Sequence, residues 1–82
     1  MSAQRVREIF ADVLGIPLEK VSDGLAYDSI PEWDSFAHMS LVAVLDETYG
    51  ITIAVDDVAQ MLTLAKTIEI LTRYGVLTSS TA

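Results

Sequence analysis

The chain has 82 residues, no cysteine and one histidine, which excludes a disulfide framework and a zinc site built from Cys and His ligands. Its 12 acidic and 5 basic residues give a formal net charge of −7, which excludes a basic nucleic-acid-binding surface. Hydrophobic residues make up 51% and charged residues 21%, a balance that favours one small globular domain over residues 1–82. We expect a cytoplasmic monomer, because no apolar run reaches the roughly 20 residues of a membrane span and no secretory signal pattern is visible.

The first predicted helix runs from Ala3 to Leu14. Its apolar residues recur at helical spacing, and they are Val6, Ile9, Phe10, Val13 and Leu14. Ser2 is the expected N-cap, Gly15 the C-terminal stop, and Pro17 prevents the helix from continuing. This segment therefore predicts an amphipathic helix with a defined end.

The next twenty residues, from Gly15 to Asp34, show no sustained hydrophobic period. Residues 17–21 can hold one helical turn, while Gly24 and Pro31 argue against anything longer. We expect a long loop that is pinned to the core by scattered apolar side chains, namely Ile16, Val21, Leu25, Tyr27, Ile30 and Trp33. For Trp33, packing as a loop anchor is favoured over contact with a partner.

A second helix is predicted from Ser35 to about Tyr49, with Asp34 as its N-cap and Gly50 as its stop. The Asp34 carboxylate can accept hydrogen bonds from unpaired first-turn amides and meets the positive end of the helix dipole. The middle of this helix is apolar on most sides, so it is expected to be the central element.

Residues 51–55 alternate with a period of two but have no partner strand, so they are expected to form an extended connector. A short third helix is predicted through about Met61, capped by Asp56 or Asp57, with Gln60 completing a capping box. The fourth, Leu64 to Tyr74, is capped by Thr63 and ended by Gly75, with Arg73 in its last turn. Its buried face is expected to comprise Leu64, Ile68 and Leu71.

These elements predict an all-α fold, a small four-helix bundle with three main helices, a short third helix and a long loop between helices one and two. Residues 78–82 have few anchors and are expected to fray.

Catalytic side chains are nearly absent. His38 follows Ser35 by three residues, but a helix points both side chains outward in parallel, and no nucleophile elbow precedes Ser35. His38 is therefore expected to be a solvated surface imidazole. The adjacent acids Asp46 and Glu47, and Asp56 and Asp57, lack the ligand spacing of a calcium loop. We predict neither a catalytic residue nor a metal site.

The segment Asp34-Ser35-Phe36 at a helix start resembles the acyl carrier protein family, whose signature is Asp-Ser-Leu at the start of the second of four helices. The resemblance extends from the first helix to about Leu77. It includes the segments Leu41-Val42, Asp46-Glu47, Tyr49-Gly50-Ile51 and Ile53, and Thr63 leading into the fourth helix with Ile68.

The resemblance implies that Ser35 bears 4′-phosphopantetheine through a phosphodiester, with Asp34 as part of the motif. The terminal thiol would hold an acyl group as a thioester for fatty-acid, lipid or polyketide-type biosynthesis. Three positions depart from the common pattern: Glu32 replaces a glycine, Phe36 a leucine, and Ser40 an acid of the second helix. Trp33 before the aspartate is similar to a subgroup with Trp-Asp-Ser.

Partner-binding residues are predicted around this motif. Phe36 beside Ser35 is expected to be exposed for docking, whereas Met39 is equally consistent with lining the site or with core packing. The acids Asp46, Glu47, Asp56 and Asp57 would attract basic patches on a phosphopantetheinyl transferase and on acyl-transferring, condensing or ligase enzymes. Two alternatives stay open: an aminoacyl or peptidyl carrier, and an unmodified helical interaction module.

Overall fold

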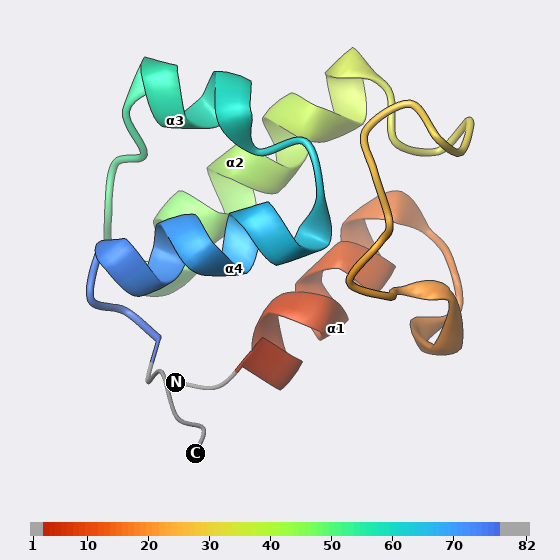
Figure 1. Cartoon of the computed structure of the whole chain (residues 1–82), viewed down its shortest axis with the longest axis horizontal. Helices are drawn as coiled ribbons and strands as arrows, with labels where there is room; N and C mark the ends of the chain where they lie inside the picture. Colours follow the sequence, from red (N-terminus) through yellow and green to blue (C-terminus); the bar gives the residue numbers. More distant parts are fainter. Residues whose placement is uncertain (1–2, 78–82) are drawn as a thin grey trace.

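The computed structural model describes residues 3–77. Within these residues the chain forms four α-helices and one 3₁₀ turn, with no β-sheet (Figure 1). The elements are α1 (Ala3–Leu14), η1 (Leu18–Lys20), α2 (Ser35–Tyr49), α3 (Val55–Gln60) and α4 (Leu64–Arg73). The predicted all-α bundle with a short third helix and a long loop before the second is confirmed.

The predicted ends of α2 and the predicted start of α4 are confirmed in detail. The Asp34 carboxylate accepts a hydrogen bond from the Ala37 amide at 2.9 Å. The Thr63 hydroxyl accepts one from the Lys66 amide at 2.9 Å. Gly50 ends α2 at φ 65°, a left-handed conformation that glycine adopts without steric cost.

The prediction that Asp56 or Asp57 caps α3 is wrong. Ala54 is the N-cap and supplies no side-chain hydrogen bond, so the capping box with Gln60 does not form. Asp57 instead accepts hydrogen bonds from residues of α4 and its C-terminal end. The predicted cap Ser2 and the predicted fraying of residues 78–82 lie outside the described residues.

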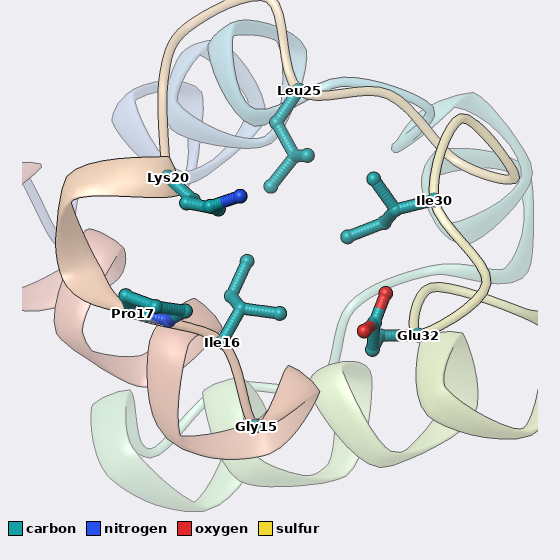
Figure 2. Close-up of a pocket in the computed structure, with 7 residues that line it drawn as sticks. All are labelled: Gly15, Ile16, Pro17, Lys20, Leu25, Ile30 and Glu32. Atoms are coloured by element: carbon teal, nitrogen blue, oxygen red, sulfur yellow. The ribbon is translucent and has the colours of Figure 1, made fainter.

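The long loop between α1 and α2 is pinned as predicted, and hydrogen bonds add to the apolar contacts. The six apolar side chains predicted as pins are buried or half-buried against the core, whereas Leu18 of η1 is exposed. The Tyr27 amide donates to the Leu62 carbonyl at 2.8 Å, and the Leu64 amide donates to the Leu25 carbonyl at 3.0 Å. These bonds join the loop to the α3–α4 turn. On its other side, the loop borders an apolar pocket beside the end of α1 (Figure 2).

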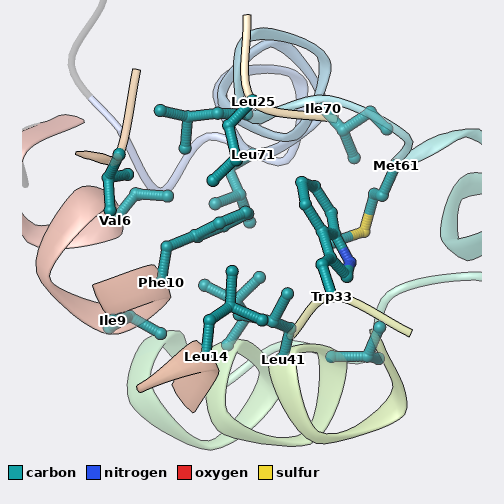
Figure 3. Close-up of a cluster of buried hydrophobic side chains, with 14 of the residues drawn as sticks. Val6, Ile9, Phe10, Leu14, Leu25, Trp33, Leu41, Met61, Ile70 and Leu71 are labelled. Atoms are coloured by element: carbon teal, nitrogen blue, oxygen red, sulfur yellow. The ribbon is translucent and has the colours of Figure 1, made fainter. Parts of the chain in front are cut away.

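The hydrophobic core lies between α1, α2, α4 and the loop, with Trp33 near its centre (Figure 3). Trp33 is fully buried, and its ring meets Phe10 of α1 edge to face at 5.2 Å between centroids. The loop-anchor interpretation of Trp33 is therefore confirmed. On α4 the buried face is wider than predicted: Ile68 is only half-buried, whereas Thr67 and Ile70 are fully buried.

Candidate functional site

Ser35 is the first residue of α2 and is exposed. Its hydroxyl makes no hydrogen bond within residues 3–77, whereas the hydroxyl of Ser29 donates to the Ala26 carbonyl and that of Thr63 caps α4. The side chain of Ser35 is thus available to solvent at a helix N-terminus.

The first-turn amides of α2 divide into two pairs. The Ala37 amide donates to the Asp34 side chain at 2.9 Å, and the His38 amide donates to the Asp34 backbone carbonyl at 2.9 Å. The amides of Ser35 and Phe36 have no acceptor within the described residues. Amides at a helix start, together with the positive end of the helix dipole, favour a phosphate group. An exposed hydroxyl beside two such amides fits a phosphodiester attachment.

The prediction that His38 is a solvated surface imidazole is wrong, because only 8% of the residue is exposed. The indole Nε1–H of Trp33 donates to His38 Nδ1 at 3.1 Å. Since Nδ1 accepts this bond, the neutral imidazole carries its proton on Nε2, which donates to the Val58 carbonyl of α3 at 2.9 Å. His38 therefore connects the loop before Ser35 to α3.

Phe36 and Met39 lie three residues apart on α2, so their side chains share a face of the helix. Phe36 is 81% exposed and Met39 is 60% exposed. This exposure excludes core packing for both residues and leaves two large apolar side chains in water near Ser35. Such a patch on a small protein is typical of a binding surface.

The four acids predicted to meet partners differ in their surroundings. Glu47 and Asp56 are exposed and make no hydrogen bond or ion pair within residues 3–77. Asp46 is half-buried, and its carboxylate accepts a hydrogen bond from the Ile53 amide at 3.1 Å. This bond gives Asp46 a local structural role despite its unfavourable place in the last turn of α2.

Asp57 belongs to a cluster that joins the start of α3 to the end of α4. The Tyr74 hydroxyl donates to Asp57 Oδ2 at 2.7 Å, and the Arg73 guanidinium donates to Oδ1 at 3.0 Å. The same hydroxyl accepts a hydrogen bond from the Ala54 amide at 2.9 Å. The Tyr74 bond first, and then that of Arg73, lower the pKa of Asp57 below its ordinary value of 3.8.

Among residues 3–77, no three histidine or acidic side chains gather as a metal site would require. None of the helices there is long and apolar enough to cross a membrane.

Two features near the site were not found by sequence reasoning. The first is the bond between Trp33 and His38, although His38 precedes Leu41 and Leu45 at the helical spacing of a buried face. The second is the pocket beside the α1–α2 loop, of whose lining residues the sequence predicts only that Ile16, Leu25 and Ile30 pin the loop to the core. Spacing along the sequence carries no signal for such a pocket, because it depends on how the loop folds back on α1.

Comparison with known proteins agrees with this geometry. The model of the family described as the phosphopantetheine attachment site matches residues 4–71. An acyl carrier protein of Sinorhizobium fredii and the acyl carrier protein AcpP of Rhizobium meliloti are each 33% identical over 67 residues. Each match covers 82% of this chain and 86% of the relative. The chain therefore belongs to the phosphopantetheine-bearing acyl carrier proteins, which carry acyl groups for partner enzymes and catalyse no reaction of their own.

Proposed function

We propose that Ser35 is the residue to which 4′-phosphopantetheine is attached. The observation that carries this proposal is an exposed, unbonded hydroxyl at the first position of α2, beside two amides without acceptors. No lysine or arginine occurs between Lys20 and Lys66, so the phosphate charge would be met by the amides and the helix dipole.

When attached, the arm supplies a terminal thiol that holds the acyl group. The chain's own residues hold the attachment point in place. Asp34 fixes the start of α2 through the Ala37 amide, and buried Trp33 fixes the backbone just before it. Ser35 thus lies in the first turn of a helix whose start is held by a side-chain hydrogen bond.

We further propose a recognition face for partner enzymes, made of Phe36, Met39, Glu47 and Asp56. Exposed aromatic and thioether side chains supply apolar anchors, and exposed carboxylates attract basic patches. Asp46 and Asp57, the sequence neighbours of Glu47 and Asp56, add negative charge, although their carboxylates also accept hydrogen bonds within the chain. The partners that fit are a phosphopantetheinyl transferase and acyl-transferring, condensing or ligase enzymes with basic docking patches.

The attachment site is tested by incubating the protein with coenzyme A and a phosphopantetheinyl transferase and measuring its intact mass. The wild type should gain one phosphopantetheinyl group, and Ser35→Ala should gain none. Ser35→Ala should lose no more than about 1 kcal/mol of stability, since Asp34 still caps α2. Ser22→Ala, which removes another exposed serine hydroxyl, is the matched control and should load normally. If Ser35→Ala still gained the group, the attachment site would be another residue. A wild type that gains no mass would favour an unmodified interaction module.

The charge on the recognition face is tested by the salt dependence of loading. The loading rate should fall as salt rises, because charges on the surface are screened over about 8–10 Å at physiological ionic strength. Glu47→Gln and Asp56→Asn should lower the rate at low salt and flatten this dependence. Glu19→Gln removes the same charge from η1 and should leave the loading rate and its salt dependence unchanged. A loading rate of the wild type that does not depend on salt would exclude a contribution of these charges to partner recognition.

A further inference from the structure

His38 is the one histidine of the chain, and the chain has no cysteine. Carboxylates ordinarily change charge below pH 5, and the side chains of lysine and tyrosine well above pH 8, whereas histidine does so between them. His38 is therefore the side chain on which a change of pH near neutrality should act. It lies between the loop that precedes Ser35 and α3, with 8% of the residue exposed.

Both ring nitrogens of His38 already have partners. Nδ1 accepts from the indole N–H of Trp33 at 3.1 Å, and Nε2 donates to the Val58 carbonyl at 2.9 Å. The indole N–H can only donate, so a proton added at Nδ1 would place two N–H donors opposite each other. Protonation of His38 therefore breaks its bond to Trp33.

The loop and α2 hold no partner for a positive charge on this ring. Within residues 3–77, no carboxylate lies within ion-pair distance of His38. The titratable side chain that contacts it from the loop is Tyr27, at 5.4 Å between ring centroids, and a phenol is ordinarily neutral in this range. On α2, Asp34 lies one turn before His38, and its carboxylate accepts from the Ala37 amide.

The facing group of α3 is the Val58 carbonyl. Of the two acids of this helix, Asp56 is exposed, and the Asp57 carboxylate accepts hydrogen bonds from residues at the end of α4. A buried charge without a counter-charge is costly, so the protonated ring should turn towards water. Trp33 is fully buried among core side chains and cannot follow it (Figure 3). The bond from His38 to Val58 is then lost as well.

α3 is the helix that this loss should affect. None of its six residues is buried, and Ala54 supplies no side-chain hydrogen bond at its start. Asp57, through its bonds to α4, and the fully buried Met61 after its end still hold it. Loss of the Val58 bond should therefore loosen α3 without detaching it from the bundle.

We propose that His38 is a pH-sensitive positioning residue. Its neutral ring holds Trp33 and α3 together near neutral pH, and its protonation in mild acid loosens α3. The loosened form binds the proton more readily than the closed form, so the closed form gains stability as pH rises. Because Asp56 of the recognition face lies on α3, mild acid should also weaken recognition by partner enzymes. This last step rests on the proposed function, whereas the loosening of α3 does not.

The loosening is tested by NMR on the ¹⁵N-labelled full chain between about pH 7.5 and about pH 5. The chain has one tryptophan and one histidine, so the indole and imidazole signals belong to Trp33 and His38. As the imidazole takes up its proton, the indole N–H signal should shift. Protection factors of the α3 amides, which correct for the pH dependence of exchange itself, should fall about two- to tenfold, the effect of one hydrogen bond. Those of the α4 amides should stay constant.

His38→Gln is the matched variant, because its amide can donate to the Val58 carbonyl and does not titrate. Its α3 protection should be independent of pH over this range. Should the variant fail to fold, the wild type still decides, since the imidazole, indole and α3 signals must change with one midpoint. An imidazole that is protonated without a change in α3, or that takes up no proton above about pH 5, would overturn the proposal.

The consequence for recognition is tested by the pH profile of loading. The ratio of KM for the wild type to KM for His38→Gln cancels the titration of the transferase itself. This ratio should rise about two- to tenfold from about pH 7.5 to about pH 5, while the ratio of kcat values stays constant. A constant KM ratio would overturn the link to recognition alone. A wild type that gains no group would overturn the attachment at Ser35, and the NMR titration would still decide the loosening of α3.

Discussion

The first two turns of α2 have one side in solvent and one side in the protein interior, although the residues of the two sides are interleaved between positions 36 and 39. Phe36 and Met39 extend into water, while His38, between them in sequence, is buried against Trp33. The outward side offers apolar surface that folding does not use. The inward side links the loop, α2 and α3 through two hydrogen bonds. A partner that binds the outward side would therefore leave the two hydrogen bonds of the inward side in place.

The sharpest test of this division compares two aromatic residues that flank Ser35. Trp33→Ala should lower the free energy of unfolding by about 3–5 kcal/mol, because it empties a fully buried site. Phe36→Ala should change it by less than about 0.5 kcal/mol, since most of that side chain is already in water. Urea denaturation measures both. Equal losses would contradict the division between the two sides.

Phe36 should instead matter for partners. Aromatic anchors at the centre of an interface cost about 2 kcal/mol or more when truncated, so Phe36→Ala should weaken transferase binding roughly thirtyfold. Titration calorimetry with the transferase measures this change. Val55→Ala, which shortens an even more exposed apolar side chain on α3, is the control. A normal affinity for Phe36→Ala would exclude this residue from the recognition face.

Truncation of His38 should give the next largest effect, a loss of stability. His38→Ala leaves the Trp33 indole N–H and the Val58 carbonyl without their partner, which should cost about 1–3 kcal/mol. Met39→Ala changes the neighbouring exposed residue and should cost less than about 0.5 kcal/mol. Chemical denaturation compares the two, and amide hydrogen exchange should show faster opening of α3 in His38→Ala alone. Unchanged exchange in α3 would mean that the Val58 bond does not hold this helix.

How well the sequence predicted each feature depends on how local its cause is. Asp34, Thr63 and Gly50 act within one helix turn, so their roles could be predicted from residue type and spacing. The polarity of His38 predicts exposure, whereas its spacing from Leu41 fits the buried face, and its partner Val58 lies 20 residues away, beyond any local pattern.

Two further features depend on tertiary contacts that no local sequence pattern predicts. Asp57 was expected to cap α3, but Arg73 and Tyr74, 16 and 17 residues later, engage its carboxylate. The pocket exists because the loop folds back on the end of α1. Asp-Ser at a helix start is by itself a weak local signal, and its position at the second of four helices makes the prediction of attachment at Ser35 specific.

The smallest effect concerns the start of α3, where the Asp57 carboxylate bonds to Arg73 and Tyr74 at the C-terminal end of α4. Because its pKa is lowered in the folded chain, the ionised carboxylate stabilises the fold above its ordinary value of 3.8. This contribution should be lost as pH falls below 3.8 and through the lowered pKa. Asp57→Asn should therefore reduce stability at pH 7 and flatten its decline in acid, as measured by urea denaturation from pH 7 to about pH 2. Asp56→Asn removes the same charge without touching Tyr74, so an equal change in both variants would assign the effect to net charge and not to the bonds of Asp57.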